Sequence, residues 1–465
     1  MGGLLTALNA GKTSLSTNQK SIEIVGNNIA NVNTTGYSRQ RAELQQIPAV
    51  NFGDFFVGQG VTVSNVRRDY DLFVTRQLHA KASDYGAASG RSNALSEIER
   101  VVNINEDSSI AAEIDNFFDA WQELTTNPSG LVERDTVIQR GQLLADTFHN
   151  TVKELDNIRY NINTTILSKV DSINATLQEI ADLNERIQMI EVTGQSANAA
   201  RDQLDVLVED LSTTLGVQTY LDSKGMTMVQ LPGGLPLVTG VHAMELEADT
   251  SSGDVQLLLH IGGTTKNLTL NNIGGEIGGM METRDVFLQG VEDDLDTLAY
   301  NLTVAVNTQH QAGTGLNDNT SRVFFAALGT STNAARNIEV SLTDSSDVAA
   351  GSGTAVTGSE PGDNTNAQLI ADLETSYLIA GQDTFDSYYS KIAADVGLEV
   401  QTNKLAMGGT EDALTQLRNL RDGVSGVSLE EEMIDLIQYQ RGFESSAKFL
   451  STIDEMMASL LQMKG

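Results

Sequence analysis

The sequence predicts a mixed, mainly α-helical chain with paired N- and C-terminal coiled-coil helices, a bundle of long helices and a small outer all-β insert. Three observations predict this fold class. Apolar residues recur every seven positions at both ends of the chain, which is the spacing of a left-handed coiled coil. No proline occurs between residues 129 and 231, so long helices are unobstructed there. After Gly216, short alternating runs separated by glycine-containing turns replace the helical period, as in small antiparallel sheets.

The composition narrows the classes of function. A chain of 465 residues is too long for one hydrophobic core, so we expect about two to four domains. The formal net charge of −33 argues against nucleic acid as a partner, because phosphates are bound by Lys and Arg. The absence of cysteine excludes disulfides and thiolate metal sites. The chain has no apolar run of about 18 residues and its first residues do not resemble a secretory signal, so we expect no membrane partner and no cleaved signal peptide.

Residues 1–32 carry the first heptad pattern. One series is wholly apolar, and an offset series is mixed; their members are Met1, Leu8, Leu15, Ile22 and Ile29, then Leu4, Gly11, Asn18, Val25 and Val32. The spacing predicts one seam of a supercoil, although an ordinary amphipathic helix on a domain core is the alternative. The segment 31–36 then predicts a turn, because Asn and Thr compete for backbone hydrogen bonds and Gly36 accepts a positive φ. An extended segment is expected from Tyr37, and 60–66 alternates as a strand does.

The middle of the chain returns to the helical period. Apolar residues predict helices from about Asp71 to Val102 and, after a cap at Ser108 or Ser109, from Ile110 to Leu124. Isoleucines spaced by seven over 166–187 and leucines over 204–215 predict two or three long antiparallel helices, interrupted at 194–198. Further helices are expected over 286–306 and 385–405, whereas the Gly-, Ser- and Asp-rich region 311–366 is expected to be the most mobile outer part.

A second heptad pattern closes the chain. Ser428 is the expected cap of the last helix, and the glutamates at 430–432 suit its N-terminal dipole. The seam positions are Leu429, Met433, Leu436, Gln440, Phe443, Ala447, Leu450, Asp454, Met457 and Leu461. An isolated two-helix hairpin is marginal in water. We therefore expect the two ends to pair, to be disordered in the isolated protein and to become ordered when neighbouring copies bury their other faces in a helical array.

No catalytic or cofactor site is predicted. Gly11–Lys12–Thr13 imitates the end of a phosphate loop, but Thr6 stands where that motif needs glycine. The five histidines are scattered without metal-ligand spacing. We therefore expect no cofactor, no metal and no enzymatic activity. A soluble acidic enzyme or binding domain with coiled-coil arms is the rival hypothesis from another class.

The stretch after the first helix resembles a known family signature. Asn28–Tyr37 is similar to the signature of the flagellar rod, hook and hook-associated proteins, and Tyr37–Gln40 narrows the resemblance to the hook-associated protein 1 family. Residues 115–124, 201–205, 306–313 and 429–447 agree with the pattern of that family, whereas 216–272 and 326–362 are variable. The signature positions are Asn28, Asn31, Thr34, Gly36, Tyr37, Ser38, Arg39 and Gln40. The segment 317–321 lacks a glycine that is usual in the family.

The resemblance implies a structural component of the bacterial flagellum that joins hook to filament and supports motility. It implies subunits exported through the flagellar type III apparatus and located outside the cell. The implied partners are further copies, hook protein, hook-associated protein 3 and a cytosolic export chaperone at the C-terminal helix. Another axial protein, hook-associated protein 3 or hook protein, is the alternative within the class.

The same resemblance implies a division of the chain. Residues 1–65 plus 415–465 would form the inner tube, 66–215 plus 273–325 and 363–414 the long-helix domain, 216–272 the outer β insert, and 326–362 a flexible outer excursion. Assembly would be mediated by the apolar seam, namely Leu4, Leu8, Leu15, Ile22, Val25, Ile29, Leu429, Met433, Leu436, Phe443, Leu450, Met457 and Leu461.

Overall fold

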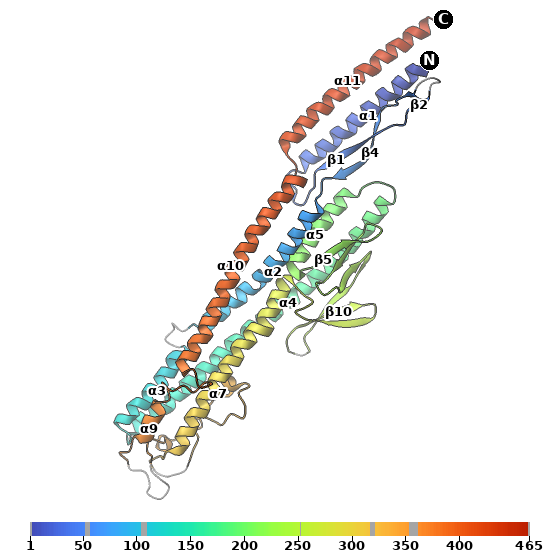
Figure 1. Cartoon of the computed structure of the whole chain (residues 1–465). Helices are drawn as coiled ribbons and strands as arrows, with labels where there is room; N and C mark the ends of the chain where they lie inside the picture. The colour runs from blue at the N-terminus through green and yellow to red at the C-terminus, as the bar shows by residue number, and fades with distance from the viewer. Residues whose placement is uncertain are drawn as a thin grey trace.

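The protein is an elongated, mainly helical molecule with both chain ends at the same extremity (Figure 1). The computed structural model describes all residues except 1, 52–55, 104–108, 252, 317–320, 353–360 and 464–465. Three parts follow one another along the long axis. A terminal unit at one end leads into a long helical body, and a β insert lies on the flank of that body (Figure 1). The predicted mainly α fold class is confirmed.

The terminal unit is a helix pair backed by a β-hairpin. Helices α1 (Gly2–Ala30) and α11 (Leu429–Gln462) lie antiparallel, so the two ends of the chain pair as predicted. The hairpin consists of β1 (Gln40–Gln46) and β4 (Val61–Arg68), with the short strands β2 (Val50–Asn51) and β3 (Phe56–Val57) nearer its tip. Ser428 caps α11 by accepting a hydrogen bond from the Glu431 amide, which confirms the predicted cap.

The helical body is built on three long helices. These are α2 (Leu72–Val101), α4 (Leu131–Glu191) and α10 (Phe385–Ser425). Shorter helices pack against them: α3 (Ile110–Thr126), α5 (Asn198–Leu215), α6 (Gly275–Glu282), α7 (Gln289–Ala312), α8 (Ala334–Asn337), α9 (Thr365–Ala371), the π-helix η1 (Thr283–Leu288) and the 3₁₀ turn η2 (Ser345–Asp347). The predicted long antiparallel helices are α4 and α5, and the predicted break falls between them.

Small residues in α2 have a packing role. A Cβ atom on Gly86 would clash with the Thr213 carbonyl, and one on Gly90 would clash with the Glu276 carbonyl. Only glycine therefore allows α2 to approach α5 and α6 so closely. The helix runs through both positions without a break.

The distal end of the body holds an aromatic core. Trp121, Phe117 and Phe324 are fully buried, with ring centroids 5.5–6.4 Å apart. Asn307 of α7 accepts from the Phe324 and Phe325 amides and donates to the Phe325 carbonyl. Within 326–362, the expected outer excursion, residues 353–360 lie outside the described part, whereas 334–350 contribute buried side chains such as Ile338 and Val348. The Gly-, Ser- and Asp-rich composition of the region did not reveal this packing.

The β insert consists of two antiparallel sheets. One contains β5 (Gln218–Leu221), β6 (Thr227–Gln230), β7 (Pro236–Thr239) and β8 (His242–Ala243) in sequence order. The other has the order β11 (Thr264–Leu268), β10 (Gln256–Ile261), β9 (Glu245–Asp249).

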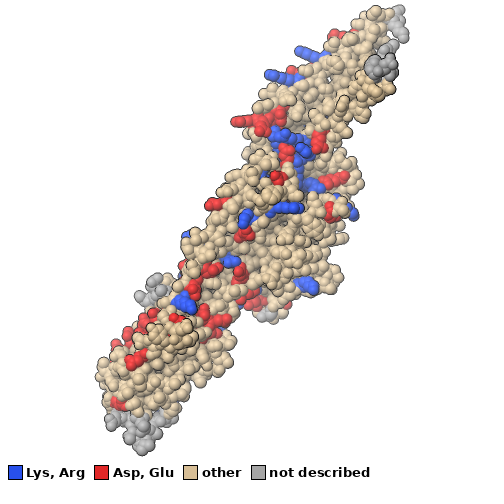
Figure 2. All heavy atoms as spheres, viewed as in Figure 1, with Lys and Arg blue, Asp and Glu red and all other residues tan. Residues whose placement is uncertain are grey.

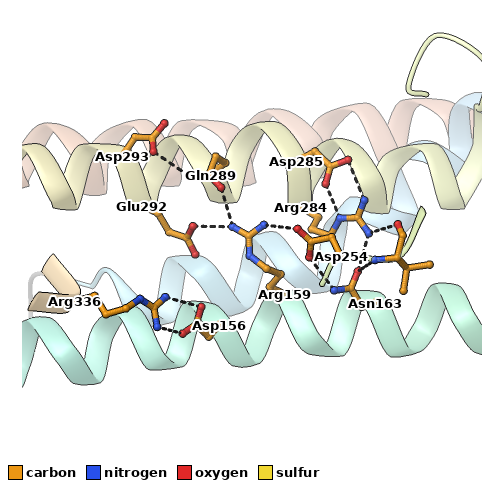
Figure 3. Close-up of polar contacts among 11 residues, drawn as sticks. Asp156, Arg159, Asn163, Asp254, Arg284, Asp285, Gln289, Glu292, Asp293 and Arg336 are labelled. Carbon is orange, nitrogen blue, oxygen red and sulfur yellow. Dashed lines mark hydrogen bonds and ion pairs between the residues drawn. The ribbon is translucent and has the colours of Figure 1, made fainter. Parts of the chain in front are cut away.

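Two arginines fasten the insert to the body (Figure 3). Arg284 of the π-helix, 3% exposed, donates to the Val255 carbonyl at 2.9 Å and to Asn163 Oδ1 at 2.7 Å. Arg159 of α4 binds Asp254 at 3.2 Å and Glu292 at 2.7 Å. The turn between β9 and β10 is therefore held by both α4 and the π-helix.

Charge is distributed unevenly over the surface. On the face shown in Figure 2, basic side chains gather where the terminal unit meets the body, and acidic side chains predominate towards the distal end. Helices α3 and α7 illustrate this, since each carries four acidic residues and no Lys or Arg.

Candidate assembly interface

The line of contact between α1 and α11 is made by small and polar residues. Ser14 and Ser446 share a hydrogen bond of 2.8 Å between their hydroxyls. One turn away, a Cβ on Gly442 would lie 2.7 Å from Asn18 Oδ1, and a Cβ on Gly11 would lie 2.8 Å from Leu450 Cδ2. Glycine at these two positions lets the helices approach closely. The helix pair is therefore held at short range, with Leu450 and Phe449 of α11 lying against Gly11 of α1.

Most of the predicted apolar seam is left partly open. Val25 is 4% exposed, whereas the other seam residues of α1 are half-buried, namely Leu4, Leu8, Leu15, Ile22 and Ile29. On α11 four are half-buried, Leu436, Phe443, Leu450 and Met457. Leu429 and Met433 are each 48% exposed and Leu461 is 68% exposed. The structure thus pairs the two helices but does not bring all seam residues together in a single copy.

Further apolar side chains of α11 are exposed. They are Ile434 (64%), Ile437 (46%), Phe449 (48%), Met456 (52%) and Leu460 (45%). Buried positions on α11 are few, and they are Glu432, Ser446 and Ile453. Large exposed apolar patches on a soluble protein mark surfaces that bind a partner. The terminal unit therefore offers an apolar surface that one copy cannot cover.

The corner after α1 is fixed by Asn28, which is 1% exposed. Its Nδ2 donates to the Gln40 carbonyl and to Glu432 Oε2, both at 2.9 Å. Its Oδ1 accepts from the Gln40 amide at 3.0 Å and from the Tyr37 hydroxyl at 2.8 Å. Burial, reinforced by Asp202 and Glu432, raises the pKa of Tyr37 to about 12, so the hydroxyl stays protonated as the donor. One amide thus ties together the end of α1, the start of β1 and α11.

Arg39 joins the corner to the first turn of α11. The side chain is 7% exposed; its Nη1 lies 2.5 Å from Glu431 Oε2, and its Nε lies 2.6 Å from Glu432 Oε1. Its backbone amide donates to the Ser425 carbonyl at the end of α10. Burial alone would lower the pKa of Arg39, but the bonds to Glu431 and Glu432 outweigh it and raise the pKa. Glu432 is 1% exposed, so the pair satisfies two charges that could not be buried separately.

A second ion cluster binds the corner to the body. Asp202 of α5 accepts from the Ser38 amide at 3.1 Å and from Arg68 Nη1 at 2.9 Å. The same Arg68 nitrogen lies 2.5 Å from Asp205, and its guanidinium stacks 4.2 Å from the Tyr70 ring. Arg68, Asp202, Asp205 and Glu432 are further candidate positions at this joint, and sequence reasoning did not single them out. Residues 201–205 and 429–447 agree with the family pattern, but no local pattern reveals contacts across 130 or more residues.

Position 36 requires glycine because of its backbone conformation and because of a neighbouring side chain. Its φ is +78°, and a Cβ there would overlap the Val206 side chain of α5. Asn31 and Thr34 bond locally: Thr34 Oγ1 donates to Asn31 Oδ1 at 3.1 Å, and Asn31 Nδ2 donates to Asn27 Oδ1 at 2.7 Å. These two residues shape the exposed turn, whereas Gly36 seats it against the body.

Within the described parts of the chain, no three His, Asp or Glu side chains are grouped to hold a metal. Among the helices described, none combines the length and apolarity needed to cross a bilayer. Gly11–Lys12–Thr13 lies inside α1, where the Thr13 hydroxyl donates to the Ala10 and Gln59 carbonyls. The loop conformation of a phosphate site is therefore absent from this segment.

Three family models match the chain. The model described as "Flagellar hook-associated protein FlgK helical domain" matches residues 95–325. "Flagellar basal body rod FlgEFG protein C-terminal" matches 423–463, and "Flagella basal body rod protein" matches 8–37. The two shorter matches coincide with α11 and with α1 and its corner.

Full-length relatives and a solved structure agree with these models. The chain is 26% identical to flagellar hook-associated protein 1 of Escherichia coli (strain K12), over 98% of this chain and 99% of that protein. It is 27% identical to the protein of the same name from Bacillus subtilis (strain 168), over 100% of this chain and 99% of that protein. The flagellar hook junction protein FlgK from Burkholderia pseudomallei superimposes with a TM-score of 0.67 at 16% identity, over 75% of this chain and 100% of that one. This structural likeness shows a shared fold.

Proposed function

The chain belongs to the family of flagellar hook-associated protein 1, and from this premise we propose that it joins hook to filament as a structural subunit of the flagellar axis. Its family is one of structural flagellar proteins, and we infer that it works by assembly and not by catalysis. The subunits would form a ring or helical array. Another axial role, that of hook-associated protein 3 or hook protein, is less well supported, because full-length matches carry the name of hook-associated protein 1.

The observation that carries the proposal is the uncovered apolar surface of the terminal unit. Met433, Ile434 and Ile437 are each 46–64% exposed on one stretch of α11. Among the described residues of one copy, no further helix covers these side chains, and burial of one such side chain contributes about 1.5–3 kcal/mol. Contacts between different faces of identical subunits propagate into helical arrays. Lateral neighbours would therefore complete the core of the terminal unit.

Each part of the chain receives a place in this array. Residues 1–65 plus 415–465 would line the inner tube, and the seam residues from Leu4 to Ile29 and from Leu429 to Leu461 would form contacts between copies. The helical body would make the next layer, the β insert 216–272 the outside, and 326–362 a further outer segment. The signature residues from Asn28 to Gln40 would set the angle at which the terminal unit leaves the body, because they bond to α11 and to α5.

The proposed partners and route follow from the same role. Hook protein on one side and hook-associated protein 3 on the other would contact the array. The subunits would be exported unfolded by the flagellar type III apparatus to the extracellular flagellum. A cytosolic chaperone would cover the exposed apolar residues of α11, such as Phe449 and Met456, before export.

Deletion of the gene tests the proposed function. We expect hooks without filaments and flagellin monomers in the medium. Complementation with Leu436→Asp or Phe443→Asp should not restore filaments, because a charge buried without a partner costs several kcal/mol. Tyr160→Asp is the matched control, since Tyr160 is 70% exposed on α4 of the body. Normal filaments on the deletion strain would overturn the proposal.

A further inference from the structure

Helix α10 is anchored to the body in two separate stretches. Its first stretch enters the main core through Phe385, Tyr389, Ile392 and Val396, which are 0–3% exposed. Asn403 ends this stretch by donating to the Ala88 carbonyl of α2 at 2.9 Å. Its second stretch touches a small cluster apart from the main core, where Leu414 packs on Leu78 and Ala82.

The two anchored stretches are separated by a span without buried side chains. All residues from Lys404 to Ala413 are described, and each is exposed or half-buried. Leu405 in this span is 68% exposed. The span is nevertheless helical throughout, and only Met407, Thr410 and Ala413 in it are half-buried.

Two consecutive glycines lie in the centre of this span. A Cβ atom on Gly408 or Gly409 would meet no heavy atom within 4 Å. This contrasts with Gly86 and Gly90 of α2, where a Cβ would strike the backbone of a neighbouring helix. Glycine inside a helix is unfavourable because its unfolded backbone has more freedom to lose. Packing explains the glycines of α2, but it does not explain the pair in α10.

The second anchored stretch is held weakly and is coupled to the terminal unit. Besides Leu414 and the partly buried Leu417, which pack in the same cluster, this stretch has the ion pairs of Arg418 and Arg421 with Glu209, at 2.9 and 3.4 Å. Arg418 is 50% exposed, and exposed ion pairs contribute little. At its end the Ser425 carbonyl accepts from the Arg39 amide of the corner at 2.7 Å. A tilt of the terminal unit therefore pulls on this end of α10.

We propose that α10 bends at Gly408–Gly409, so that residues 410–425 move with the terminal unit while residues 385–403 stay fixed in the distal core. The pair acts as a pivot because it is the point of lowest helix propensity in a span without a buried side chain. This use of the pivot rests on the proposed function, in which a subunit must fit between two unlike structures. The bending itself is a property of the single chain and can be measured without assembly.

Spin labels placed on either side of the pair test the proposal. The chain contains no cysteine, so Leu398→Cys and Leu420→Cys, at positions 67% and 52% exposed, take up label selectively in the full-length protein. The labelled positions are 22 residues apart, which is about 33 Å along a straight helix. Pulsed electron–electron double resonance should show two populations, one at the label-to-label distance of a straight helix and one at the shorter distance of a bent helix. Gly408→Ala and Gly409→Ala should each reduce the bent population about fivefold.

Two further variants separate the pivot from general effects. Gly397→Ala changes another α10 glycine with open space around it, but in the anchored stretch, and should leave the distance distribution unchanged. Glu209→Gln removes both ion pairs and should enlarge the bent population. A single narrow distance in the unsubstituted protein that neither alanine variant alters would overturn the pivot. Bending without any defect in filament formation in the deletion strain would refute the proposed function and leave the pivot standing.

Discussion

His310 makes the stability of the distal body depend on pH. The residue is 1% exposed and belongs to the aromatic core around Trp121 and Phe324. Its Nδ1–H donates to the Arg322 carbonyl at 2.8 Å, and its Nε2 accepts from the Ala349 amide at 3.0 Å. Protonation of Nε2 would remove that acceptor and place a charge near Arg134. Burial, as the main cause, therefore lowers the pKa of His310 to about 4.

The sign and size of the effect follow from the two pKa values. The unfolded chain binds a proton below a pKa of 6.5, whereas the folded protein resists protonation until about 4. The stability of the folded protein that depends on neutral His310 is therefore complete above pH 6.5 and is lost as the pH falls towards 4. This difference between the unfolded and folded pKa of His310 corresponds to roughly 3 kcal/mol of unfolding free energy. His79, whose pKa burial also lowers to about 4, adds a loss in the same direction.

Urea unfolding between pH 7.5 and 4, followed by Trp121 fluorescence, measures this loss. His310→Gln retains a donor and an acceptor, and it should remove the share of the pH dependence that belongs to His310. His242→Gln changes an exposed histidine of β8 and is the matched control. Comparing the variants cancels the contribution of the carboxylates to the pH dependence, because their titration is common to all three proteins. Equal pH dependence in the unsubstituted protein and His310→Gln would refute the assigned role.

The remaining predictions concern the terminal unit. Gly36→Val should abolish filament formation, because the new side chain overlaps Val206 and the left-handed backbone adds strain of about 1–2 kcal/mol. Gly194→Val is the control: φ there is +82° and the space is open, so this variant has the backbone strain without an overlap and should be tolerated. Arg39→Met leaves Glu432 buried without its cation and should lower the free energy of unfolding by about 3–5 kcal/mol, measured by thermal unfolding. Arg41→Met, at a side chain 55% exposed, should lower it by less than about 1 kcal/mol. Equal losses in the two variants would contradict the role of the buried pair. Amides 3–30 should exchange rapidly in dilute monomer and slowly in the assembled flagellum, and full protection in the monomer would disprove ordering on assembly.

Local signals in the sequence determined the elements of the fold. The proline-free heptads predicted α4, and its 61 residues run until the Gly194–Asn198 stretch that had been expected to interrupt them. Ser109 and Ser428 cap α3 and α11 as their side chains allow. The corner residues from Asn28 to Gln40 were sufficient to identify the family, because their pattern is specific. Each of these signals depends on residues close together in the chain, so no knowledge of the fold was needed.

The tertiary structure alone decided which surfaces meet. A heptad pattern states which face of a helix is apolar but not what covers that face, and the contact between α1 and α11 proved to use Gly11, Ser14 and Ser446. The partners of the signature residues, Asp202 and Glu432, lie 164 and 404 positions away from Ser38 and Asn28. Charge and hydrogen-bond complementarity over such separations arises only once the chain has folded. The sequence by itself therefore determined the elements and the family, whereas only the folded chain decided how the terminal unit is joined to the body.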